Sequence, residues 1–176
     1  RLVPLPGGPR TRSIVSTLVA RARSPRVRSN YEAIGGGSPI VETTRHQAAA
    51  LEEELVARGH DVVVVVAQRH GYPGTAAAVD ALLSAGVDRV AMFPLFPQYS
   101  GTTTGSSEAE LRQILVDRGA DIPVTVIRSW CEHPSYLNAQ AQLIDEMLAE
   151  LSDDELEQAL VVFSAHGLPQ RIVDRG

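Results

Sequence analysis

The chain contains no lysine, because all 16 of its basic residues are arginine. A Walker-type phosphate loop and a lysine Schiff base both need a lysine, so neither chemistry is available within residues 1–176. The chain also has a single cysteine, Cys131, which excludes an internal disulfide and is typical of proteins from a reducing compartment. Cys131 and His133 are close in sequence, but nothing nearby completes a zinc site, so we interpret both as non-metal residues.

Long apolar runs are absent as well. The longest, residues 62–67, is far shorter than the ~20 residues of a membrane-spanning helix, and no signal-peptide pattern opens the chain. Acidic residues outnumber basic ones by 21 to 16, and the formal net charge of −5 argues against a nucleic-acid partner. We therefore expect a soluble, cytoplasmic protein, for which peripheral association with the inner membrane stays open.

Arginine is concentrated near the amino terminus. This local excess of positive charge could meet an acidic ligand, or it could be a solvated helix face, and the sequence alone does not decide between the two. The six arginines of this segment are Arg10, Arg12, Arg21, Arg23, Arg26 and Arg28.

The order of apolar runs and amphipathic segments predicts an α/β fold. The chain has 176 residues, of which 44% are hydrophobic, and this is enough to form one domain with a sizeable core. β-Branched runs predict strands, and segments with helical periodicity lie between them. This alternation favours a doubly wound, Rossmann-like sheet of four parallel strands with helices on both faces. The expected strands are residues 61–67, 87–95, 122–128 and 159–164, and the expected helices are residues 11–23, 39–58, 75–85, 107–119 and 135–151.

His166 follows the last expected strand, and a loop rich in hydroxyls and glycine follows the strand at 87–95. In an open parallel sheet, ligands bind outside the carboxyl ends of the strands, so both segments should open on the ligand-binding edge. Because a neutral histidine ring offers a lone pair near pH 7, His166 is a candidate proton acceptor or metal ligand. The alternative is a histidine that only satisfies a backbone carbonyl.

Three motifs together resemble those of the ferrochelatase family: Phe-Pro-Gln-Tyr-Ser-Gly-Thr-Thr-Thr-Gly-Ser-Ser at residues 96–107, Phe-Ser-Ala-His-Gly-Leu-Pro at residues 163–169 and Ile-Gly-Gly-Gly-Ser-Pro at residues 34–39. That family inserts ferrous iron into protoporphyrin IX to form protohaem, the last step of haem biosynthesis. The resemblance implies that His166 accepts pyrrole protons or ligates the metal. It also implies a set of porphyrin-binding residues, namely Tyr31, Ile34, Ser38, Pro39, Tyr99, Ser100 and Thr102.

The same resemblance implies that residues 1–176 are one α/β lobe of a larger, chelatase-like protein. The family's first strand, with its Asn-Leu-Gly-Gly-Pro loop, has no counterpart here. Its carboxyl-terminal lobe, which carries the acidic partner of the histidine, is also missing. We therefore expect a fragment that is inactive alone. Ferrous iron and protoporphyrin IX would be substrates, with no cofactor required in this lobe. An iron–sulfur cluster, the choice between protoporphyrin and coproporphyrin, and the oligomeric state stay open.

Other functions remain as alternatives. A related chelatase could insert another metal, or use another tetrapyrrole, with the same histidine. A non-catalytic tetrapyrrole-binding fragment would need no acidic partner. A hydrolase with Ser164 as nucleophile is disfavoured, because Ser164 and His166 are two residues apart and the Gly-x-Ser-x-Gly elbow is missing.

Overall fold

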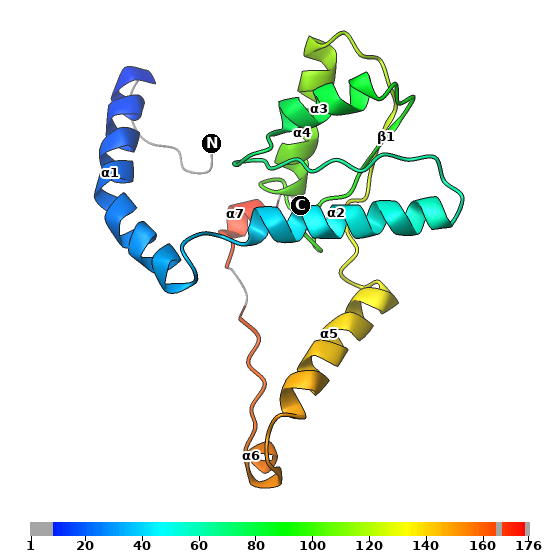
Figure 1. The fold of residues 1–176 in the computed structure, drawn as a ribbon. Coiled ribbons are helices and arrows are strands. Elements are labelled where there is room, and N and C mark those ends of the chain that lie inside the picture. Colours follow the sequence, from blue (N-terminus) through cyan, green and yellow to red (C-terminus); the bar gives the residue numbers. More distant parts are fainter. Residues whose placement is uncertain (1–8, 165–166, 175–176) are drawn as a thin grey trace. The chain divides into compact units, whose positions relative to one another are not determined.

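The computed structural model describes residues 9–164 and 167–174, and the chain divides into two compact units, Arg1–Ala85 and Gly86–Gly176 (Figure 1). The described helices of the first unit are α1 (Pro9–Ala33), α2 (Ile40–Ala57) and α3 (Thr75–Ser84). The described elements of the second unit are β1 (Val90–Met92), α4 (Thr104–Asp117), β2 (Val124–Val126), α5 (Pro134–Leu148), α6 (Asp153–Glu157) and α7 (Gln170–Val173).

Helix α1 is longer than the sequence predicts. We expected it to end near Arg23, because the apolar residues with helical spacing lie between Thr11 and Arg23. In the structure the helix passes through Pro25 and ends at Ala33. A proline removes a single intrahelical hydrogen bond, and the bonds of the following turn are enough to continue the helix.

Helix α2 matches its predicted bounds closely. The side-chain oxygen of Ser38 accepts the backbone N–H of Ile40 at 3.3 Å, and Pro39 already has helical dihedral angles. At the other end the helix stops before Gly59, whose N–H donates to the carbonyl of Val56 at 2.9 Å. The predicted glycine stop is confirmed, while the helix begins one residue later than predicted, with Pro39 as its cap and Ile40 as its first residue.

Residues 61–67, which we predicted as a central strand, are not part of a sheet in the structure. The N–H of Val64 donates to the carboxylate of Glu52 on α2, at 2.6 Å, and not to a neighbouring strand. Val62 and Val63 are exposed, although a central strand would bury them. A β-branched run favours extended backbone, but a central strand also needs neighbouring strands to pair with and helices that cover both faces of the sheet.

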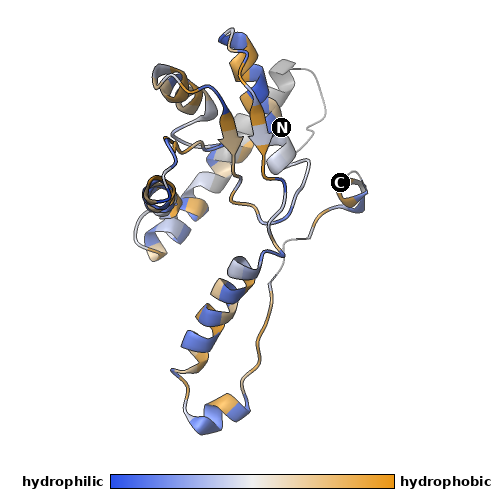
Figure 2. Cartoon of the chain, turned by 90° about the vertical axis from the view of Figure 1, so that its right-hand side faces the viewer, coloured by the Kyte–Doolittle hydropathy of each residue, from blue (hydrophilic) through white to orange (hydrophobic). Residues whose placement is uncertain are grey.

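The sheet lies in the second unit and has two parallel strands, β1 and β2, which run side by side in Figure 2. Val90 pairs with Val124 and Met92 with Val126. Both strands are shorter than the predicted 87–95 and 122–128. One reason is that Pro94, just after β1, lacks the N–H that a longer ladder needs.

Helix α4 connects the two strands and supplies most of this unit's core. Leu111 and Leu115, one turn apart on the same face, are buried together with Val90 of β1. We predicted that the helix would begin at a capping box formed by residues 107–110, and this is wrong. It begins at Thr104, and the Ser107 hydroxyl donates back to the carbonyl of Thr103 at 3.0 Å inside the first turn.

Beyond α5 the predicted capping box of Ser152 and Glu155 is present and starts α6. Residues 159–164, predicted as the fourth strand, follow without joining the sheet, and Figure 2 shows them as largely hydrophobic. The side chains of Leu160 and Phe163 are each 83% exposed. The structure is therefore α/β with a two-stranded parallel sheet, and it does not confirm four strands. Within the described residues no helix has the length and apolar character to cross a membrane.

Candidate functional site

The site is built where the carboxyl ends of β1 and β2 open into two segments that bind each other. The carbonyl of Pro97, in the loop after β1, accepts three hydrogen bonds from the segment after β2. The donors are the backbone N–H of Trp130 at 2.9 Å, the N–H of Cys131 at 3.2 Å and the hydroxyl of Ser129 at 3.1 Å. Because proline fixes φ and offers only its carbonyl, Pro97 holds that acceptor in a defined direction.

Trp130 anchors the same edge with its side chain. The indole N–H donates to the carbonyl of Pro94 at 2.9 Å. The indole ring also lies between Phe93, at a centroid distance of 5.4 Å, and Tyr136 of α5, at 4.8 Å in an edge-to-face arrangement. These are favourable geometries for aromatic pairs. The loop after β1, the segment after β2 and α5 thus share one aromatic contact.

Sequence reasoning did not select Trp130 as a site residue. A signal was available, because Trp130 follows the strand predicted at 122–128. The carboxyl ends of parallel strands open on the same edge of a sheet, so a large aromatic residue there was a candidate for the site.

The predicted porphyrin-binding residues Tyr99, Ser100 and Thr102 lie together in the loop before α4. The hydroxyls of Ser100 and Thr102 are 2.9 Å apart, and the N–H of Thr102 donates to Ser100 Oγ at 3.3 Å. The carbonyl of Ser100 accepts the N–H of Thr103 at 3.1 Å and that of Gly105 at 3.0 Å. Ser100 is buried, so its hydroxyl and carbonyl shape the loop from within.

Tyr99 lies against the first turn of α4. A β-carbon built on Gly105 would stand 2.8 Å from the Tyr99 hydroxyl oxygen, closer than real β-carbons come. Because Gly105 has no side chain, the hydroxyl end of Tyr99 can lie against the backbone there. On its ring face, Tyr99 meets the guanidinium of Arg128, whose central carbon is 5.3 Å from the ring centroid. This distance suits a cation–π contact.

The other predicted binding residues lie in the first unit, around the turn from α1 to α2. The carbonyl of Tyr31 accepts the N–H of Ile34 at 3.2 Å and that of Gly36 at 2.8 Å. Gly35 and Gly36 have φ of +104° and +92°, a backbone conformation that side chains disfavour, so the two glycines allow this tight turn. Tyr31 and Ile34 are exposed, and so are Ser38 and Pro39 after the turn.

His166, predicted as the proton acceptor and metal ligand, lies outside the described residues. Among those that are described, no group of three or more His, Cys, Asp or Glu side chains could hold a metal ion. His133, which we interpreted as a non-metal residue, starts helix α5: its Nδ1 atom accepts the N–H of Ser135 at 3.3 Å.

Comparison with known proteins identifies the family. The family model described as ferrochelatase matches residues 1–176. A ferrochelatase of Geotalea uraniireducens (strain Rf4) is 42% identical over 163 residues, covering 92% of this chain and 49% of the relative. A ferrochelatase of Desulfotalea psychrophila (strain LSv54 / DSM 12343) is 39% identical over 173 residues, covering 98% of this chain and 53% of the relative.

A third relative, the ferrochelatase of Synechococcus sp. (strain CC9311), is 38% identical over 159 residues, covering 89% of this chain and 40% of the relative. The chain thus spans about half the length of the curated relatives it matches. A match over every residue of the chain, with relatives near 40% identity, is decisive for the family. The chain belongs to the ferrochelatase family.

Proposed function

We propose that the protein carrying this chain inserts ferrous iron into protoporphyrin IX and forms protohaem. The observation that carries the proposal is the edge at the carboxyl ends of β1 and β2. There the Tyr99 loop is fastened to the segment after β2 by the carbonyls of Pro94 and Pro97. A flat macrocycle needs apolar and aromatic walls held in place by a few polar groups, and this edge combines both. Family membership supports the same reaction.

Each predicted binding residue has a part in the proposal. Tyr99 contacts the macrocycle, while Ser100 and Thr102 keep the Tyr99 loop in shape through their mutual hydrogen bond. The exposed Tyr31 and Ile34, with Ser38 and Pro39, form a second contact with the porphyrin. Exposed apolar side chains on a glycine turn are suited to this, because they can cover a ligand without first breaking a packed core.

His166 is the proposed base. Two pyrrole N–H bonds break as the ferrous ion enters, both protons leave the macrocycle, and the nitrogen lone pairs bind the metal. A neutral imidazole has one basic lone pair, so near pH 7 His166 either accepts the protons one at a time, passing the first to solvent before it takes the second, or ligates the incoming ion, which is a substrate and not a resident cofactor. No cofactor is required from residues 1–176 in this scheme.

The architecture of the whole protein is part of the proposal. Residues 1–176 form one lobe, and residues 61–67 and 159–164 join β1 and β2 in a four-stranded sheet when that lobe is complete. The exposed apolar side chains of Leu160, Val162 and Phe163 support this, because such a run gains stability when it is buried between neighbours. The lone Cys131 fits a cytoplasmic protein.

The test is an anaerobic assay of the purified full-length protein with ferrous iron and protoporphyrin IX, followed by the absorbance of protohaem. Reactions without iron, and with iron held by a chelator, are the controls. Parallel reactions with cobalt and with coproporphyrin separate the related chelatases. Porphyrin fluorescence quenching without any metalloporphyrin product would identify a binding protein and would contradict the proposal.

A further inference from the structure

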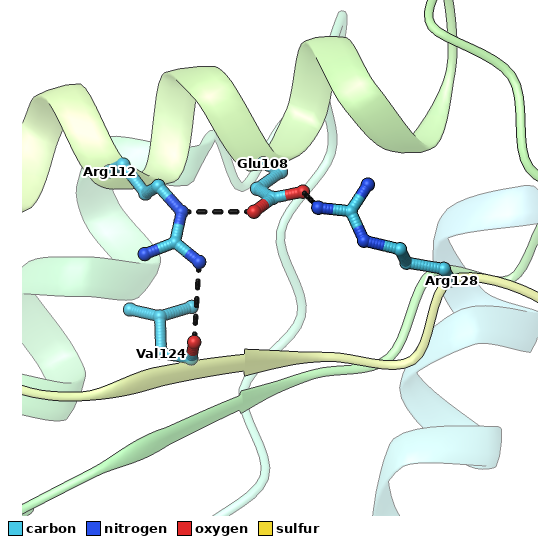
Figure 3. Close-up of polar contacts among 4 residues, drawn as sticks. All are labelled: Glu108, Arg112, Val124 and Arg128. Carbon is cyan, nitrogen blue, oxygen red and sulfur yellow. Dashed lines mark hydrogen bonds and ion pairs between the residues drawn. The ribbon is translucent and has the colours of Figure 1, made fainter. Parts of the chain in front are cut away.

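A largely covered carboxylate joins two arginines beside the Tyr99 loop. Glu108 of α4 is only 12% exposed at its side chain, and its two oxygens accept from different guanidinium groups (Figure 3). Arg112, one turn further along α4, donates through Nε at 3.0 Å. Arg128, just after β2, donates through Nη2 at 2.8 Å. Charge-assisted bonds of this length are the stronger kind of hydrogen bond.

Glu108 is also linked to the sheet, through Arg112. Arg112 also donates through Nη2 to the backbone carbonyl of Val124 in β2, at 3.3 Å. Glu108 and Arg112 are neighbours at i,i+4 on α4, so this pair ties the helix to the strand. The carboxylate that holds Arg128 is therefore anchored to both secondary-structure elements.

Arg128, held by Glu108, in turn contacts Tyr99. Its guanidinium lies over the phenol ring at 5.3 Å, while the hydroxyl end of the ring lies against Gly105. The ring is thus in contact at one face and at its tip. Two guanidiniums around one carboxylate leave a net charge of +1 in the group, so the pairing with Glu108 does not neutralise the cation that faces the ring.

We propose that Arg128 is a positioning residue that orients Tyr99 for the tetrapyrrole, and that Glu108 holds Arg128 in place. The inference rests on the proposed function, because Tyr99 must contact the macrocycle for its orientation to matter. Arg128 acts through Tyr99 and takes no part in proton transfer. Its loss therefore weakens porphyrin binding and leaves the insertion step nearly unchanged.

The experiment uses the full-length protein with the variants Arg128→Gln, Arg128→Lys and Glu108→Gln. The matched control is Arg89→Gln, which removes an exposed arginine that is paired with the adjacent Asp88 at the amino-terminal end of β1. Porphyrin Kd is measured by fluorescence quenching, and KM and kcat by haem formation. We expect Arg128→Gln to raise Kd and KM about 10-fold with kcat nearly unchanged, and Glu108→Gln to raise them about 5-fold.

Arg128→Lys should recover part of the affinity because it keeps the cation, and Arg89→Gln should match the wild type. A double-mutant cycle then shows whether Arg128 works through the tyrosine: in a Tyr99→Leu background, Arg128→Gln should have no further effect on Kd. A full effect in that background would mean that Arg128 acts directly on the substrate, and the inference would be wrong. An unchanged Kd in the folded Arg128→Gln single variant would also overturn it.

A second readout does not depend on activity. The side-chain protons of Arg128 should show NMR shifts from the Tyr99 ring current, which Tyr99→Leu abolishes and Glu108→Gln reduces. The absence of these shifts in the wild type would refute the contact. If the wild-type protein neither binds porphyrin nor forms haem, the proposed function fails first, and the inference fails with it. The two failures are distinguishable, because the proposed function fails in assays of the wild type, whereas the inference alone fails only in the comparison of the variants.

Discussion

Two regions of the second unit overlap with family motifs, and they differ in how many contacts hold them in the structure. Residues 94–105 are fastened by the carbonyls of Pro94 and Pro97 and by the indole of Trp130. In residues 159–164, the apolar side chains stand exposed, with Phe163 at 83%. The first region finds its partner 36 residues along the chain. The first region is thus held by partners among the described residues, whereas residues 159–164 do not join the sheet there.

The largest effect on activity should come from His166, two residues beyond the second region. In the full-length protein, His166→Ala should lower the rate of iron insertion at least about 100-fold, because it removes the proposed general base. Porphyrin affinity should change little if the macrocycle is held mainly by the Tyr99 loop, as we propose. Single-turnover haem formation and fluorescence quenching measure the two quantities.

The control for this change is His60→Ala, which removes an exposed histidine just after α2. It should leave both quantities unchanged. Near-normal insertion by His166→Ala would mean that His166 satisfies a backbone group, and the proposed mechanism would have to be given up.

In the whole protein, the contrast between the held residues 94–105 and the exposed residues 159–164 can be tested by stability measurements. If residues 159–164 join the sheet there, Phe163→Ala should lower the free energy of unfolding by about 3 kcal/mol, as expected for a buried phenylalanine. Met147→Ala, at a position that is 72% exposed on α5, is the control and should have little effect. Urea denaturation gives both values. Equal, small effects would show that the segment stays exposed and that the fourth strand does not form.

A moderate effect is expected in the fastened region. Trp130→Ala should lower the free energy of unfolding by about 2 kcal/mol, because the side chain is half-buried and loses contacts with Phe93 and Tyr136. Trp130→Phe keeps an aromatic ring but loses the hydrogen bond to Pro94, and should lower it by about 1 kcal/mol. If both changes proved neutral by urea denaturation, Trp130 would not be the anchor of this edge.

The smallest effect concerns the capping box that precedes the second region. The side-chain hydrogen bond from Ser152, followed by the bond from the Ser152 backbone, lowers the pKa of Glu155. Because the folded pKa is the lower one, the cap stabilises α6 above the ordinary pKa of glutamate. This stabilisation is lost as the pH falls through the lowered value. In an NMR titration, the pKa of Glu155 should move toward the ordinary value in Ser152→Ala, because the side-chain bond is lost while the backbone bond remains, and an identical titration in both proteins would rule out the side-chain cap.

The features that the sequence predicted correctly are local ones, although two other local predictions, the end of α1 near Arg23 and the capping box at residues 107–110, are wrong. The glycine stop of α2 at Gly59 and the capping box at Ser152 depend on residues a few positions apart, and both are confirmed. The strands at 61–67 and 159–164 depend on partners distant in sequence, which an apolar run does not specify. The contacts of Trp130 and Arg128 escaped prediction for the same reason: they form only when β1 and β2 pair.

The bond between Glu52 and Val64 has a consequence for how this chain avoids other chains. An unpaired N–H in a β-branched run is a docking point for a foreign strand, and such edges promote aggregation. The Glu52 carboxylate occupies that N–H and brings a negative charge beside it. A newly made chain would thus have this β-branched segment protected by its own preceding helix. Glu52→Ala should be recognised less by lost activity than by a shift of the expressed protein into the insoluble fraction.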